Sequence, residues 1–386
     1  MKADLVAKGA GRYVVGKVER FDQKNEMFSR LVWDPKILDL GQKFRMEEVM
    51  PKDKPGYRLQ DQAFVNAAWH LESNFAGGIR SGRKGLYAWD WDGKFTYPLV
   101  PSGLRITVDD PMKITRGIKK VARFFGASLV GVCELDERWL YSHAYSPYIE
   151  GDKPIEKIEI PEAYKYAIVI AIEMDYKGIS CSPAHPASVA TGTVYSKMAF
   201  VAGLLAQYIR GLGYQAIPCG NDTACSIPIA IDAGLGELAR NGLLITPEFG
   251  PRVRLCKVFT DLPLVPDKPI EFGVWDFCLE CERCAEHCPS KAIMFGEPTQ
   301  EINNISNRGG LLRWPINAEK CLAFWAANGT DCSNCIRVCP FNKPPGCLHS
   351  AVRWGVKKTR WMDSLFVKVD DLLGYGRQGN SEHFWE

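Results

Sequence analysis

The sequence predicts an α/β (α+β) protein joined to a small cysteine-rich domain, and three observations lead to this prediction. Apolar strands alternate with helices between about residue 109 and residue 260, the pattern of a sheet covered by helices. Eight of the fourteen cysteines lie between residues 278 and 339, in two tight groups. The 386 residues, 46% hydrophobic and 24% charged, have ordinary globular composition and room for two to three domains of roughly 150 residues.

The first part of the chain is aromatic and irregular. Aromatic residues are dense within thirty positions among many glycines, and they include Trp69, Tyr87, Trp89, Trp91, Phe95 and Tyr97. We expect residues 1–108 to form a unit of loops and helices that covers a site built by the rest of the chain.

The next 164 positions, 109–272, carry the α/β pattern. A helix is predicted to begin at Asp110-Pro111, an N-cap followed by proline at the first helical position, and to run to about Gly126. Further helices are predicted at 187–212 and 227–241, the latter with Gly242 as its C-cap. Strands are predicted at 128–135, 166–174, 214–218, 243–246 and 253–259. Residues 261–269 contain three prolines and are predicted to be an extended link to the cysteine-rich domain, 273–344, which a tail, 345–386, follows.

The spacing of the cysteines predicts two [4Fe–4S] clusters. The first group is Cys278-x2-Cys281-x2-Cys284-x3-Cys288-Pro, and the second is Cys321-x10-Cys332-x2-Cys335-x3-Cys339-Pro. Three cysteines on a tight loop can bind three corners of a cubane, and the cysteine before proline binds the cluster of the other group. We therefore assign one cluster to Cys278, Cys281, Cys284 and Cys339, and the other to Cys321, Cys332, Cys335 and Cys288.

Paired zinc sites are the alternative, but zinc favours two C-x2-C pairs and gives no reason for a Cys-Pro in fourth position. Two clusters in one module make a path for electrons, and the preceding 270 or so residues need another explanation. No G-x-G-x-x-G follows a strand, and no histidine pair has metal-binding spacing. The residues alone therefore predict an iron–sulfur oxidoreductase with an unidentified second cofactor or substrate.

Charge and hydropathy exclude other classes. The 48 Lys and Arg against 45 Asp and Glu give a net charge of +3, which offers no electrostatic basis for a nucleic-acid partner. We find no apolar run near the ~18 residues of a membrane-spanning helix. Residues 1–4 have no apolar signal core, so we expect a chain made without a signal or a mature chain.

Several stretches resemble corrinoid-dependent reductive dehalogenases of the respiratory type. They are TPEFGPRVRL at 246–255, LVPDKP at 264–269, the two cysteine groups, and DDLLGYG at 370–376. The resemblance is dense from about residue 110 to residue 376. It implies a nitroreductase-like domain that binds a base-off corrinoid over residues 109–272, followed by a ferredoxin-like domain. No Asp-x-His-x-x-Gly motif for an axial histidine occurs, which agrees with a base-off cofactor.

The resemblance also implies the site residues. Tyr195 corresponds to the family's proton donor, Arg254 to the arginine that supports it, and Asn221 to an active-site asparagine. Trp325 corresponds to an aromatic residue that lines the substrate pocket. Thr191, one turn before Tyr195, should share its helix face and also line the pocket. The density of aromatic residues makes Trp89 and Tyr97 further expected pocket walls. Without the resemblance, each residue has a structural interpretation. Tyr195 would be a core tyrosine on an apolar helix, Arg254 would form a structural ion pair, and Asn221 would cap the following helix.

The activity implied is replacement of C–Cl by C–H in a small chlorinated hydrocarbon, with chloroform or chlorinated ethanes as the expected substrates. Electrons would pass through both clusters to a Co(I) corrinoid. The resemblance implies a membrane anchor subunit, a respiratory electron donor and no nucleic acid, and it is compatible with a homodimer. It places the mature protein on the outer face of the cytoplasmic membrane after twin-arginine export, or in the cytoplasm if produced recombinantly.

Two alternatives remain. An epoxyqueuosine reductase, a tRNA-modifying enzyme, shares the corrinoid and both clusters but uses a carboxylic acid as its proton donor. A two-cluster electron-transfer protein would have neither corrinoid nor substrate.

Overall fold

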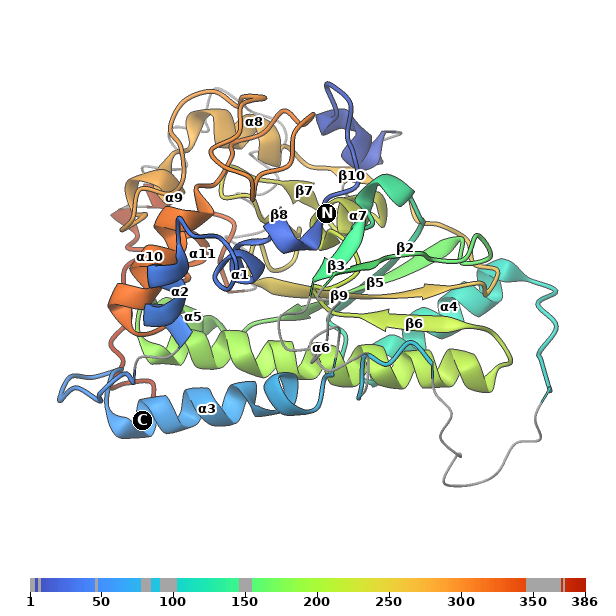
Figure 1. The fold of residues 1–386 in the computed structure, drawn as a ribbon, viewed down its shortest axis with the longest axis horizontal. Helices are drawn as coiled ribbons and strands as arrows, with labels where there is room; N and C mark the ends of the chain where they lie inside the picture. Colours follow the sequence, from blue (N-terminus) through green and yellow to red (C-terminus); the bar gives the residue numbers. More distant parts are fainter. Residues whose placement is uncertain are drawn as a thin grey trace.

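The computed structural model describes residues 4–5, 8–45, 48–77, 85–90, 103–145, 155–344, 369–370 and 372–386. Its centre is a four-stranded sheet in the order β2-β5-β9-β6, with every neighbouring pair antiparallel. The strands are β2 Leu129–Glu134, β5 Tyr166–Glu173, β6 Ala216–Cys219 and β9 Val253–Thr260. The long helix α6, His185–Gly211, runs along one face of this sheet (Figure 1).

The central strand β5 shows why these strands form. Its sequence, YAIVIAIE, is apolar at consecutive positions, and its six inner residues are all buried. Ile168, Ile170 and Ile172 pack with α6, whereas the alternate residues Ala167, Val169 and Ala171 pack into a second core on the opposite face. A strand covered on both faces needs a continuous apolar run instead of an alternating one, and the predicted α/β pattern is confirmed.

The helices of this region agree with the sequence at their beginnings. In α4, Pro111–Phe124, the side chain of Asp110 accepts hydrogen bonds from the backbone N–H groups of Met112 and Lys113, at 2.9 and 3.0 Å. Helix α6 is 27 residues long and by length and composition alone is apolar enough to cross a membrane, so the expectation that no stretch qualifies was wrong. It is mostly buried as the core helix of this fold.

The predicted helix over 227–241 is wrong in its second half. Helix α7 covers only Ser226–Asp232, and Gly234, at φ +72°, turns the chain out of the helix. Strand β7, Glu237–Leu238, then pairs with β8, Leu244–Ile245, so Gly242 at φ +71° lies in a hairpin turn and is not a helix C-cap. Glycine suits both positions because a side chain there would be strained.

The N-terminal residues do not stand apart from the rest. Helix α3, Leu59–Asn74, lies along α6, and helix α2, Leu38–Arg45, packs against α10, Ala318–Asn328 (Figure 1). Strand β1, Asp4–Leu5, pairs with β10, Ile270–Glu271. The domain boundaries at 108, 272 and 344 therefore remain predictions.

The remaining elements are short. The cysteine-rich domain contains α8 Val274–Glu280, α9 Arg283–Glu286, α10 and α11 Asn334–Arg337. Helices α9, α10 and α11 lie on the left in Figure 1, and α8 lies at the top. The others are η1 Gly9–Tyr13, η2 Gln23–Asn25, α1 Met27–Arg30, η4 Glu137–Trp139, β3 His143–Tyr145, β4 Ile155–Lys157 and α5 Tyr176–Ser180.

One carboxylate in this fold predicts a pH dependence of stability. Asp232, at the end of α7, accepts hydrogen bonds from the backbone N–H of Ala10 at 2.7 Å and the indole of Trp139 at 3.1 Å. Burial raises the pKa of the Asp232 carboxyl to about 6. Because the folded state then holds this proton more tightly than the unfolded state, the free energy of unfolding should fall as pH rises from about 4 to about 6, by roughly 3 kcal/mol at most.

The measurement is urea unfolding between about pH 4.5 and pH 7.5, with Asp232→Asn compared with wild type. The difference between the two proteins should change over this range. Asp109→Asn, at an exposed carboxylate, is the control. A difference between wild type and Asp232→Asn that is constant with pH would contradict the assignment.

Candidate functional site

Tyr195 lies on α6, and three side chains surround it. Two of them, Asn221 and Arg254, were predicted to belong to the site, and the third, Trp69, was not. The side-chain Nδ2 of Asn221 donates a hydrogen bond to the Tyr195 Oη at 2.7 Å. The guanidinium carbon of Arg254 lies 5.5 Å from the centroid of the Tyr195 ring. The indole of Trp69 stacks on the same ring, with 4.8 Å between centroids and 28° between planes. The structure thus brings together the three residues predicted to be catalytic.

The sheet explains how these residues meet. In β9 alternate residues face opposite sides, so that Cys256 and Val258 join the core beneath α6 while Leu255 and Phe259 join the other core. Arg254 is two residues before Cys256 in the strand, so its side chain lies on the same face of the sheet, the face covered by α6. Asn221 follows β6, which pairs with β9 at the edge of the sheet. A strand side chain and a loop side chain therefore converge on one helix.

The loop that carries Asn221 is held by Lys257, a residue that the sequence analysis did not single out. The Lys257 side chain is fully buried, and its Nζ donates to the carbonyl oxygens of Gly220 at 2.5 Å and Asp222 at 3.2 Å. In the same loop Thr223 has φ +71°, in the left-handed region that costs a threonine energy. Asn221 does not cap α7, whose N-cap residue is Cys225. A lone lysine in an apolar strand was the available sequence signal.

Trp69 is a second residue that was not assigned to the site. Its indole N–H donates to Ser188 Oγ at 3.4 Å, and its ring lies against Gly192, where a Cβ atom would come within 2.4 Å of the indole. Because Gly192 has no side chain, the Trp69 ring fits against α6 there and stacks on Tyr195, which follows about one helical turn after Gly192. The sequence showed Trp69 only as one aromatic residue among many.

The predicted pocket residues are placed differently. Thr191 is buried, and its hydroxyl faces the sulfur of Met174 at 3.7 Å. Trp325, on α10, packs among N-terminal residues, with 6.0 Å between its ring and that of Phe28. Trp89 packs into the cores on the face of the sheet opposite Tyr195, so the structure does not bring it to the other site residues. Tyr97 lies outside the described residues.

Arg254 connects the tyrosine to the cysteine-rich domain. Its charge acts on both Asp331 and Cys335. Burial raises the pKa of the Asp331 carboxyl, which a hydrogen bond with Ser188 and the charge of Arg254 oppose. Within the described ranges, Arg254 Nε and the indole nitrogen of Trp325 are buried donors without a hydrogen-bond partner. The Arg254 side chain lies over the ring of Tyr195, where a bound corrinoid or substrate would satisfy its Nε donor.

Most electrostatic neighbours of the cysteine thiols follow the two predicted sets, and the division of the ligands between two clusters stays a prediction. Cys339 interacts electrostatically with Cys278 and Cys281, although it belongs to the other sequence group, and both Cys339 and Cys284 also interact with Cys335 of the second set. Cys321 interacts with Cys332 and Cys288, and Cys335 with all three. No three His, Cys, Asp or Glu side chains in the described part of the chain converge as ligands of a single metal ion would.

The donor chemistry of these sets fits iron–sulfur clusters. Burial raises the pKa of Cys278 to about 12 and that of Cys281 to about 11, so cationic iron is needed to hold these sulfurs as thiolates. The Cys288 sulfur accepts a hydrogen bond from the backbone N–H of Ala292 at 3.3 Å. Such bonds to sulfur are among the features that set cluster potentials.

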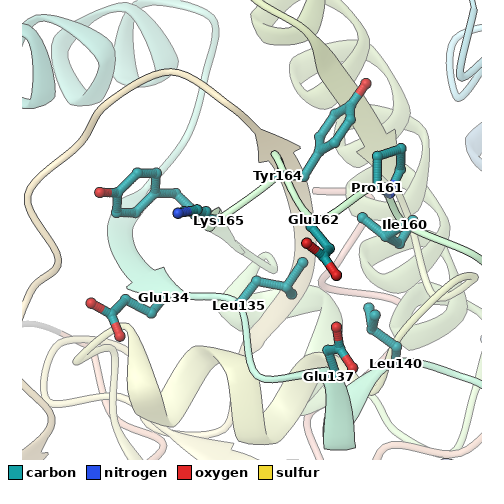
Figure 2. Close-up of a pocket in the computed structure, with 10 residues that line it drawn as sticks. Glu134, Leu135, Glu137, Leu140, Ile160, Pro161, Glu162, Tyr164 and Lys165 are labelled. Carbon is teal, nitrogen blue, oxygen red and sulfur yellow. The ribbon is translucent and has the colours of Figure 1, made fainter.

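An open pocket of about 400 Å³ lies elsewhere, at the end of β2 and the start of β5 (Figure 2). Three carboxylates, Glu134, Glu137 and Glu162, line it together with Lys165. None of the predicted site residues lines this pocket.

Comparison with known proteins identifies the cysteine-rich domain and the family of the chain. Residues 277–342 match the family described as a 4Fe-4S double cluster binding domain. The tetrachloroethene reductive dehalogenase of Sulfurospirillum multivorans is 39% identical over 353 residues, covering 84% of this chain and 70% of that protein. The tetrachloroethene reductive dehalogenase of Desulfitobacterium hafniense is 37% identical, covering 77% of this chain and 60% of that protein.

A solved reductive dehalogenase structure, reported with a mechanism for B12-dependent dehalogenation, has a TM-score of 0.72 at 25% identity. It covers 97% of this chain, and this chain spans 49% of it. The predicted mixed α/β fold with a double-cluster domain is confirmed, and so, at the level of the family, are the corrinoid and the two [4Fe–4S] clusters. The relatives named here act on a chloroethene and do not favour the expected chlorinated-alkane type. The chain belongs to the reductive dehalogenase family, whose members are iron–sulfur and corrinoid oxidoreductases.

Proposed function

We propose that this protein replaces C–Cl by C–H in a small chlorinated hydrocarbon, with Tyr195 as the proton donor. The observation that carries the proposal is the convergence of Asn221 and Arg254 on Tyr195, next to the cysteine set that contains Cys335. The balanced reaction consumes two electrons and one proton and releases one chloride ion. A bound corrinoid supplies the two-electron cleavage of the carbon–chlorine bond.

The protein's own residues supply the proton. A free tyrosine loses its proton only near a pH of about 10, so the phenolate that remains after proton transfer needs stabilisation. The Asn221 amide donates to the phenol oxygen at 2.7 Å, and the Arg254 guanidinium lies over the ring at 5.5 Å. A hydrogen-bond donor and a nearby cation both favour the charged form of an acid. The stacked indole of Trp69 covers one face of the ring and limits the access of water.

The substrate is proposed only as a class. Relatives that are 39% and 37% identical are tetrachloroethene reductive dehalogenases, whereas the sequence resemblance led us to expect chloroform or chlorinated ethanes. Aromatic rings around Tyr195 and Trp325 suit an apolar molecule. Both substrate types therefore belong in the test.

The test is chloride release under strict anoxia with reduced viologen as the electron donor. The panel contains tetrachloroethene, chloroform and 1,1,1-trichloroethane, with about eight irons and one cobalt per chain verified in the same sample. Chloride from any of the three supports the proposal, and the ranking reports the substrate type. No release from a fully loaded protein would overturn it in favour of epoxyqueuosine reduction, and four irons or fewer would contradict the two-cluster assignment.

We also propose the location and partners that the resemblance implies: a peripheral protein on the outer face of the cytoplasmic membrane, with a membrane anchor subunit and a respiratory donor. Fractionation of the native host, followed by detection in the membrane fraction and its release by high salt or detergent, tests this. Recovery only with cytoplasmic markers would contradict it.

Lys257→Met is expected to lower turnover because it releases the loop that places Asn221. The carbonyl oxygens of Gly220 and Asp222 lose their buried donor, and a shift of about 1 Å in a catalytic group can cost roughly 100-fold in rate. The loss should appear in kcat with little change in KM, and Lys257→Arg should restore part of it. Lys120→Met, at an exposed lysine of α4, is the control. Full kcat in a folded Lys257→Met protein would contradict this role.

A further inference from the structure

The hairpin turn between β7 and β8, residues 239–243, lies against the loops of both cysteine sets. Its Arg240 side chain is fully buried. The Arg240 Nη2 donates to the carbonyl oxygen of Cys278 at 2.6 Å, and its Nε donates to the carbonyl oxygens of Cys278 and Cys281 at 3.1 and 3.2 Å. Its Nη1 donates to the carbonyl oxygens of Met294 and Gly296 at 3.1 and 2.8 Å. The Arg240 guanidinium thus links the loop that carries Cys278 and Cys281 to the segment at Met294 and Gly296 through hydrogen bonds.

The neighbouring residue reaches the second set. The Asn241 side chain is buried, and its Nδ2 donates to the carbonyl oxygen of Cys335 at 3.3 Å. Its Oδ1 accepts from the backbone N–H of Leu243 at 3.2 Å, within the same turn. Two consecutive residues from outside the cysteine-rich domain therefore hold one loop of each set.

The charge of Arg240 is only partly compensated. Of the described carboxylates, Glu282 lies within ion-pair distance at 3.5 Å, and its side chain is 32% exposed, so solvent screens it. Glu237 also acts on Cys278, but it pairs with Arg12 at 3.6 Å and accepts from the backbone N–H of Phe272. Two other cations near the first set, Arg283 and Lys343, are both paired with the buried carboxylate of Asp370, Arg283 at 2.9 Å. Arg240 is therefore a buried cation facing the first set.

We propose that Arg240 is a positioning residue that raises the reduction potential of the cluster bound by Cys278, Cys281, Cys284 and Cys339. Reduction of a cluster adds one negative charge to it. A buried cation stabilises that charge strongly because the surrounding dielectric constant is low, and net charge and hydrogen bonding set cluster potentials. Asn241, which is neutral, has no such effect on the other cluster.

The experiment is an EPR-monitored redox titration of the iron-loaded protein, with each signal assigned through cysteine variants of each set. Arg240→Gln keeps donor groups but removes the charge, and it should lower the potential of the first cluster while the second is unchanged. Arg240→Lys keeps the charge and should leave the first potential close to that of wild type. Asn241→Asp introduces a negative charge beside Cys335 and should lower the potential of the second cluster alone.

Equal potentials for the first cluster in wild type and Arg240→Gln, with iron content intact, would overturn the proposal. If Arg240→Gln fails to retain the first cluster, the lysine variant decides: a lowered first potential with the charge preserved would also overturn it. The titration needs neither a halogenated substrate nor turnover. The effect of Arg240 on the cluster potential can therefore be measured even if the protein does not dehalogenate any of the tested substrates.

Discussion

Tyr195→Phe should retain both kinds of cofactor and lose most of its dechlorination. The phenyl ring can still stack on Trp69, so the packing of α3 against α6 is preserved. The variant lacks the hydroxyl that accepts from Asn221 and that we propose donates the proton. General acid catalysis contributes about 10²–10⁴-fold, and we expect a loss of that order in kcat. The measurement is chloride release with iron and cobalt determined on the same sample.

Tyr208→Phe is the matched control for this variant. Tyr208 lies on the same helix, α6, with 37% of its surface exposed, so removal of its hydroxyl should not change turnover. Undiminished dechlorination by Tyr195→Phe would remove Tyr195 as the proton donor. Loss of cobalt from that variant would instead indicate that the hydroxyl supports cofactor binding.

Cys288→Ser should damage the cluster of the second cysteine set, although Cys288 belongs to the first sequence group. Its electrostatic neighbours are Cys321, Cys332 and Cys335. A serine hydroxyl is a poor substitute for a thiolate at iron, so iron should fall from about eight per chain towards about four. EPR of the reduced protein should show the signal of the first cluster retained and that of the second lost or altered. Electron delivery, and with it turnover, should fall in parallel.

Cys133→Ser provides the control. The Cys133 thiol is buried in β2 and donates to the carbonyl oxygen of Ile229 at 3.5 Å, a contact that a hydroxyl can also make. Both clusters should survive this change. Loss of the first cluster and retention of the second in Cys288→Ser would overturn the crossed assignment.

The elements that the sequence predicted well share strong local signals. Strand β5 is an uninterrupted apolar run, α4 has an Asp-Pro start, and α6 has a long apolar pattern. The failure at 227–241 has a local cause that propensity does not resolve. Gly234 and Gly242 can each end a helix or form a tight turn, and the pairing of β7 with β8 decides between these outcomes.

The site divides in the same way. The family resemblance pointed to Tyr195, Arg254 and Asn221, and the structure places them together. Lys257 and Arg240 had no comparable signal. Each is a single basic residue whose partners are backbone carbonyl oxygens from distant parts of the chain. Trp89 was selected from the density of aromatic residues, which does not specify the face of the sheet on which a ring packs.

Local pattern was thus sufficient for the α/β strands, the double-cluster domain and the family to which the chain belongs, because spacing along the chain constrains those features directly. Long-range packing alone determined that Trp69 covers Tyr195, that Lys257 holds the Asn221 loop, and that one hairpin turn touches both cysteine sets. A buried cation is stable only where enough carbonyl or carboxylate oxygens converge on it. That convergence is a property of the folded chain and leaves no periodicity in the sequence.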